Sequence, residues 1–92
     1  MLLVKLRARE GQEAALEKEL RALVEPTRAE RGCYLYELHH SADQPGLFLF
    51  HEIWASREHH ARHLQTAHMQ RWVGRQEAVL ASREASFWTR MD

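Results

Sequence analysis

The sequence lacks a pair of cysteines for a disulfide, a membrane-spanning segment and the pattern of a signal peptide. Cys33 is the only cysteine among 92 residues, so no disulfide can form within the chain. No apolar run approaches the roughly 20 residues that a membrane span needs. The first ten residues also lack the basic, apolar and small-residue order of a signal peptide. We therefore expect a cytoplasmic protein with a free thiol.

A surplus of either charge is absent as well. Thirteen Lys and Arg residues balance thirteen Asp and Glu residues. A neutral chain has no strong field to attract nucleic acid or an anionic membrane. We therefore expect neither as a partner. With 45% hydrophobic residues, the composition is that of an ordinary globular protein.

The first third of the chain changes from strand-like to helix-like spacing. Apolar and polar residues alternate over residues 2–7, which predicts a strand. From Gln12 the apolar residues recur on one helical face. Pro26 is expected to kink or end this helix, or the helix could continue past it. Gly32 is expected to end it. The residues of the apolar face are Leu16, Leu20, Leu23 and Val24.

The rest of the chain predicts a hairpin, a broken helix and a last strand. Residues 33–40 and 47–54 are rich in strand-forming residues, and a turn-rich segment joins them. Ser56 is placed to cap a helix that reaches about Gln65. Thr66 is placed to cap a second one to about residue 80, and residues 82–91 form the last strand. The order β-α-β-β-α-β predicts a single α+β domain over residues 1–92, with a ferredoxin-like fold.

Both faces of the strand over residues 47–54 are mainly apolar. Helices in this fold cover one side of the sheet, so the other side would expose an apolar patch that soluble monomers seldom show. A chain of this length also buries a thin core on its own. We therefore expect a homodimer that packs sheet against sheet. The alternative is that the last strand and the loops cover the open side.

The segment from Glu25 to Met69 carries a family pattern. Its elements are Gly32-Cys33 after a helix, Tyr34 and Tyr36 in the next strand, Pro45 in a turn, Glu52-x-Trp54, and two spaced histidines, His63 and His68. This pattern resembles the antibiotic biosynthesis monooxygenase family of small dimeric α+β barrel proteins. The resemblance extends weakly over nearly the whole chain and implies the same fold and a homodimer.

The resemblance implies several possible activities. Members that this chain resembles include quinol monooxygenases, polyketide anthrone oxygenases, haem degraders and an isomerase-like enzyme. The haem degraders and anthrone oxygenases use an asparagine beside Trp and His, and this chain has no asparagine. The haem-degrading branch and the anthrone mechanism are therefore disfavoured.

Glu52 is the first candidate catalytic residue. Its neighbours on the same strand face are Phe50 and Trp54, which should desolvate the carboxylate and raise its pKa toward the range useful for proton transfer. The alternative is a structural glutamate paired with an arginine or a backbone amide. The resemblance favours the catalytic role.

His63 and His68 are the other candidate catalytic residues. Five residues apart, they do not share one face of a continuous helix, but a break near Thr66 would let both turn inward. The alternative is that both are solvated. His59 and His63 lie one turn apart, a spacing that suits a metal ion, but the sequence specifies no third ligand. We therefore predict no metal and no cofactor.

Aromatic residues are expected to bind the substrate. Tyr34 and Tyr36 should share a strand face, and their hydroxyl groups could orient a phenolic ring, although core packing is the ordinary role of such residues. We expect His60 on the surface and His51 on the face opposite Glu52. The predicted substrate-binding residues are Tyr36, Phe50, Trp54 and Trp72.

These residues predict a cofactor-independent monooxygenase acting on a quinol or phenolic small molecule and dioxygen. Glu52, or His63 acting with it, would remove a proton in an apolar pocket. Two alternatives stay open. One is an isomerase of a small oxygenated metabolite that uses the same groups. The other is a non-catalytic module for ligand binding or the stress response.

Overall fold

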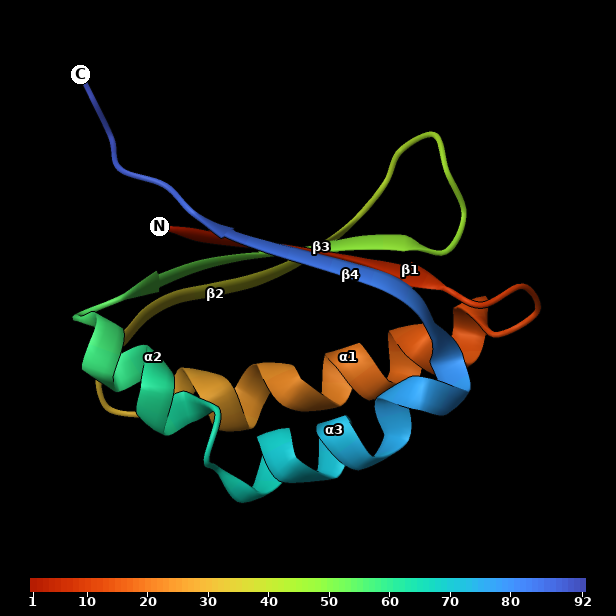
Figure 1. The fold of residues 1–92 in the computed structure, drawn as a ribbon, viewed down its shortest axis with the longest axis horizontal. Coiled ribbons are helices and arrows are strands. Elements are labelled where there is room, and N and C mark those ends of the chain that lie inside the picture. The colour runs from red at the N-terminus through yellow and green to blue at the C-terminus, as the bar shows by residue number, and fades with distance from the viewer.

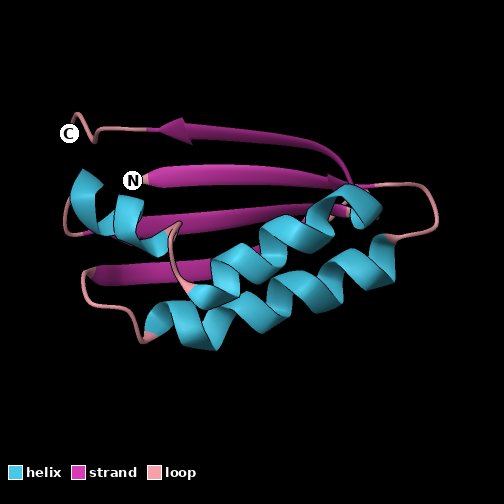
Figure 2. Ribbon diagram, turned by 60° about the horizontal axis from the view of Figure 1, so that its bottom comes forward, coloured by secondary structure: helices cyan, strands magenta, loops and turns pink.

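A four-stranded antiparallel sheet and three helices make up the computed structural model, which describes residues 1–92. The strand order is β2-β3-β1-β4, and all three helices lie on one face of the sheet (Figures 1 and 2). This arrangement confirms the predicted α+β, ferredoxin-like fold. The elements are β1 (Leu2–Ala8), α1 (Glu13–Arg28), β2 (Cys33–His40), β3 (Leu47–Trp54), α2 (Arg57–His63), α3 (Ala67–Val79) and β4 (Leu80–Phe87).

The core lies between the sheet and the helices. Alternate residues of β1 and β3 point toward the helices, and those of β1 are all apolar. In β3 the same alternation buries Phe48, Phe50 and Glu52, so a carboxylate takes a core position. Helix α1 adds the residues of one face, with Pro26 inside its last turn. The buried residues of α1 are Leu16, Leu20, Leu23 and Thr27.

Gly32 lets the chain turn tightly from α1 into β2. Its φ of +85° is a conformation that residues with a Cβ rarely adopt, and a Cβ at this position would overlap the ring of His59. The Gly32 carbonyl also accepts a hydrogen bond from the backbone N–H of Ala55, just after β3. The end of α1 is thereby held against the start of α2.

The break between α2 and α3 lies at Thr66, as the sequence predicts. The Thr66 hydroxyl accepts from the backbone N–H of Met69 and donates to the carbonyl of His63 at 2.7 Å. Ser56 caps α2 in the same way by accepting from the N–H of His59. Two caps ten residues apart therefore divide the second helix into α2 and α3 and fix where each begins.

Two expectations about strands were wrong. The last strand begins at Leu80 rather than at residue 82, because Leu80 is already extended and pairs with Ala8, and it ends at Phe87. Tyr34 does not share a face with Tyr36. The pairing of β2 with β3 shifts by one residue between Cys33 and Leu35, which turns the Tyr34 side chain to solvent, with 73% of it exposed.

The face of the sheet opposite the helices stays open in the single chain. It carries Leu47, Leu49, His51 and Ile53 of β3, which are half-buried or exposed. His51 lies on this face, as expected, and its Nδ1 lies 3.5 Å from a carboxylate oxygen of Glu37. Sheet-to-sheet dimerisation stays a prediction. No helix has both the length and the hydrophobicity that crossing a membrane requires.

Candidate functional site

Glu52 is a buried carboxylate with one protein hydrogen bond. Only 3% of the residue is exposed, and its Oε1 accepts the indole N–H of Trp54 at 2.8 Å. Burial raises its pKa to about 7, against the opposing effects of the Trp54 N–H and the Arg83 charge. Its partner is therefore an indole rather than the arginine or backbone amide of the structural alternative. Oε2 remains without a protein partner.

His63 is held in place by a residue that the sequence did not suggest. Its Nδ1 lies 2.7 Å from Oε2 of Glu30, in the loop after α1. A carboxylate can only accept, so Nδ1 donates when the imidazole is neutral. Burial lowers the pKa of His63, and the Glu30 carboxylate opposes this effect. The ring, 2% exposed, packs 4.7 Å from the Trp54 ring, measured between centroids.

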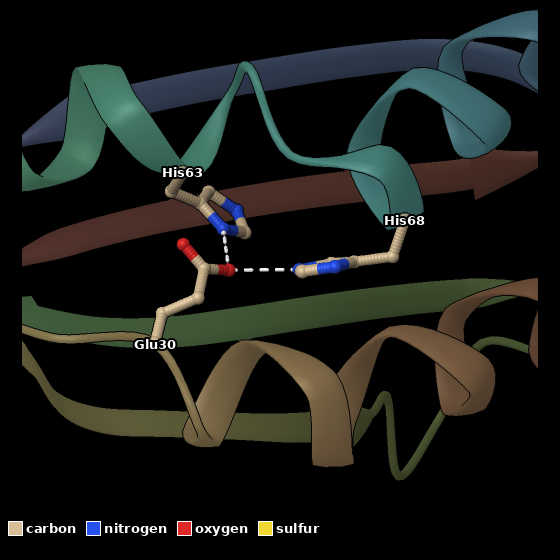
Figure 3. Close-up of side chains that lie close together, drawn as sticks. All are labelled: Glu30, His63 and His68. Atoms are coloured by element: carbon tan, nitrogen blue, oxygen red, sulfur yellow. Dashed lines mark hydrogen bonds and ion pairs between the residues drawn. The ribbon is translucent and has the colours of Figure 1, made fainter.

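His68 meets the same carboxylate oxygen from the other side. Its Nε2 lies 2.7 Å from Glu30 Oε2 and 3.2 Å from the Thr66 hydroxyl. Figure 3 shows the three side chains pointing at one spot from three segments: the loop after α1, the end of α2 and the start of α3. Both predicted histidines thus turn inward, and the break at Thr66 is what allows residues five apart to converge.

A small cavity lies between the sheet and the helices beside Glu52 and His63. Its volume is about 30 Å³, which is room for about two water molecules. It receives five of the seven predicted site residues. The twelve lining residues are Val4, Leu6, Leu23, Tyr36, Phe50, Glu52, His60, His63, Leu64, Met69, Trp72 and Arg83.

Tyr36 and Phe50 form an aromatic wall of this cavity. Their rings stack with centroids 4.6 Å apart. Burial, aided by the nearby Glu52 charge, raises the pKa of Tyr36 well above that of a free phenol. The Tyr36 hydroxyl therefore keeps its proton at neutral pH, and it can donate a hydrogen bond but not act as a base.

Three residues differ from their predicted places. Trp54 does not line the cavity; it holds Glu52 from the side and lines a separate surface pocket with Phe87. His68 is outside the cavity too. His60 was expected on the surface, but it lines the cavity because the α2 helix turns it toward His63, with ring centroids 5.9 Å apart.

Glu30 is the residue that sequence reasoning missed. It lies 33 positions before His63, and no local spacing links the two. One sequence signal could have found it. Glu30 lies two residues before Gly32, and the chain at Gly32 and Cys33 meets the end of β3 that carries Trp54. The metal pair considered from the sequence does not form, since Nδ1 of His59 lies 2.7 Å from the Ser56 hydroxyl. The acid and histidines that do gather are Glu30, His63 and His68.

The model of the antibiotic biosynthesis monooxygenase family matches residues 1–75. The chain belongs to this family. No protein of curated function matches the sequence.

Solved structures agree with membership of the antibiotic biosynthesis monooxygenase family. PA3566 from Pseudomonas aeruginosa is 37% identical with a TM-score of 0.96, over 99% of this chain and 92% of that one. Rv0793 from Mycobacterium tuberculosis is 27% identical with a TM-score of 0.91, over 99% and 93%. A structure described as an antibiotic biosynthesis monooxygenase is 25% identical with a TM-score of 0.91, over 99% and 97%. The family supports a monooxygenase-like role in general.

Proposed function

We propose that this member of the family is a homodimeric, cofactor-independent monooxygenase acting on a quinol or phenolic small molecule. The observation that carries the proposal is Glu52, a buried carboxylate with a free oxygen on the wall of an aromatic cavity. A base with a pKa near neutrality is well matched to removing a proton from a phenolic hydroxyl group.

The reaction needs little from the protein beyond proton transfer. Glu52 takes a hydroquinone proton, and the anion passes one electron to dioxygen. The semiquinone and superoxide combine at a ring carbon to give a peroxide. Cleavage of its O–O bond leaves one oxygen on the ring and releases the other as water. One quinol and one dioxygen thus give one hydroxyquinone and one water, with the quinol supplying all the electrons.

Other side chains take positioning parts in this proposal. His63, fixed by Glu30, lies on the same cavity wall as Glu52 and would hold a substrate oxygen. Tyr36, Phe50 and Trp72 would stack against the ring and exclude water, which strengthens interactions with the anion. Trp54 would act through Glu52 by fixing its Oε1.

The cavity must open before it can hold a quinol, because its present volume fits only about two waters. Leu64, at the end of α2, and Arg83, on the edge strand β4, belong to its wall and are exposed residues. We propose that substrate entry displaces these two side chains. Neither residue belongs to β1 or β3, so both side chains can move without disturbing those strands.

Oxygen uptake by the purified protein with a reduced naphthoquinone, corrected for autoxidation, tests the function. Labelled dioxygen should place one labelled atom in the quinone product. Substrate turnover without oxygen consumption would instead support an isomerase that uses the same groups. Tight binding without turnover would support a ligand-binding module.

A further inference from the structure

We propose that Glu30, His63 and His68 form a binding site for a divalent transition-metal ion such as zinc. One atom from each side chain lies within 4.8 Å of the others. A single carboxylate oxygen, Glu30 Oε2, lies 2.7 Å from both His63 Nδ1 and His68 Nε2. Figure 3 shows the three side chains converging from three segments of the chain.

The donor set suits such an ion. Two imidazole nitrogens and one carboxylate oxygen are common zinc ligands, and a water molecule or another small group can complete four-coordination. The same set also accepts cobalt, iron and nickel. It is unsuited to calcium or magnesium, which prefer oxygen ligands.

Metal binding requires adjustment of the Glu30 carboxylate and of the two imidazole rings, whose donor atoms now lie within 4.8 Å of one another. Bonds of about 2.0–2.2 Å to a tetrahedral ion place neighbouring ligand atoms roughly 3.3 Å apart. The carboxylate oxygen must therefore move away from each nitrogen by about half an ångström. Glu30 follows α1 in a loop, so its side chain can rotate without moving a strand.

Burial and charge also favour a cation. The His63 side chain is 2% exposed, and those of Glu30 and His68 are 13% exposed. The ion-pair partners of the Glu30 carboxylate are these two imidazoles, and no lysine or arginine joins them. A largely buried carboxylate without a permanent positive partner is costly, and a divalent ion would supply that charge.

The fold prepares the site before any ion binds. Thr66 caps α3 and bonds to the carbonyl of His63, which fixes the break that brings His63 and His68 together. Its hydroxyl also lies 3.2 Å from His68 Nε2, a contact that a metal ion bound at this nitrogen would replace. The competing explanation is a hydrogen-bonded cluster that only ties α1 to α2 and α3.

Metal titration of the untagged, chelator-treated protein tests the proposal without any substrate. Zinc measured by calorimetry, and cobalt followed by its visible absorption, should each bind at one ion per chain and raise the melting temperature. Glu30→Gln and His68→Ala should weaken binding at least about 10- to 100-fold. His40→Ala removes an exposed histidine at the far end of β2 and should leave binding unchanged.

Two results would overturn the metal site. One is the absence of stoichiometric binding by the wild-type protein. The other is an equal loss of affinity in His40→Ala and His68→Ala, which would indicate scattered surface histidines. Circular dichroism checks folding, and Glu30→Gln, which keeps the size of the side chain, decides the matter if His68→Ala does not fold. The inference goes beyond the proposed oxygenase, and either can fail while the other stands.

Discussion

The indole of Trp54 donates a hydrogen bond to Glu52, two residues earlier on the same face of β3, at 2.8 Å. The bond satisfies one carboxylate oxygen and leaves the other for the cavity wall. It also lowers the pKa of Glu52 against the larger opposing effect of burial. The strand alternation places Glu52 in the core, which raises its pKa, and places Trp54 beside it, which partly lowers that pKa.

Replacing Glu52 by glutamine should abolish most of the proposed oxygenase activity. Glutamine keeps the size of the side chain and can still accept the Trp54 N–H, but it is not a base. Oxygen uptake with a hydroquinone should fall roughly 10²- to 10⁴-fold, the usual contribution of general-base catalysis. Glu37→Gln, on the opposite face of the sheet, is the matched control and should keep wild-type uptake. Full activity in Glu52→Gln would remove this residue from the mechanism.

The raised pKa of Glu52 should appear in the pH dependence of activity. The carboxylate is the active form, so turnover should rise as the pH increases through about 7 and level off above it. Initial rates of oxygen uptake, corrected for faster autoxidation at high pH, measure this curve. A rate that is flat from about pH 5 to about pH 8 would contradict Glu52 as the base.

Glu52 should also make the folded protein less stable as the pH rises. Its folded pKa of about 7 exceeds the usual 4.5, so its favourable contribution is complete below 4.5 and is lost as the pH rises to 7. The loss is about 3 kcal/mol. Urea unfolding at about pH 5 and about pH 8 should therefore show Glu52→Gln gaining stability relative to wild type at the higher pH. An unchanged difference would mean that Glu52 is not desolvated.

Gly32→Ala should destabilise the fold more than the same change at Gly11. Both glycines have positive φ, +85° and +81°, so both substitutions strain the backbone, by roughly 1–3 kcal/mol. Only at Gly32 does the added Cβ also meet a side chain, the ring of His59, whereas at Gly11 it meets open space. Thermal unfolding of the two variants measures the difference. Equal melting temperatures would show that the His59 ring moves aside freely.

The open face of the sheet should hold two copies of the chain together. Light scattering at micromolar concentration should give about twice the chain mass of 10.9 kDa. Ile53→Glu should weaken assembly, since it places a charge beside Leu47, Leu49 and His51. Val73→Glu introduces the same charge at an exposed residue of α3 and should leave the dimer intact. A stable, native monomer of the wild type would defeat the argument.

Hydrophobic spacing was sufficient to predict most of the fold. The bounds of β2 and β3 followed from strand-forming residues between turn residues, and the helix break followed from the capping ability of Thr66. The bulge at Tyr34 did not follow, because nothing in the local pattern marks an extra residue in one strand of a pair. Where the last helix passes directly into β4, no turn residue marks the boundary either.

The site was predictable where it depends on local sequence patterns, such as the alternation in β3 and the helix break at Thr66. Alternation in β3 was enough to place Glu52 inside and His51 outside. Glu30 was missed, because its contact with His63 depends on how the loop after α1 meets the end of α2, 33 residues later in the sequence. Trp54 was expected to contact the substrate, and in the structure its indole N–H donates a hydrogen bond to Glu52.

Strand β4 pairs with β1 on one side only, and its other edge is free along its length. Free backbone N–H and C=O groups on such an edge can recruit strands from other molecules and start aggregation. Arg83 and Glu84 stand in the middle of this edge, where an incoming strand would have to desolvate two charges. These two charges therefore oppose pairing of this edge with strands of other molecules, whatever reaction the interior of the protein performs.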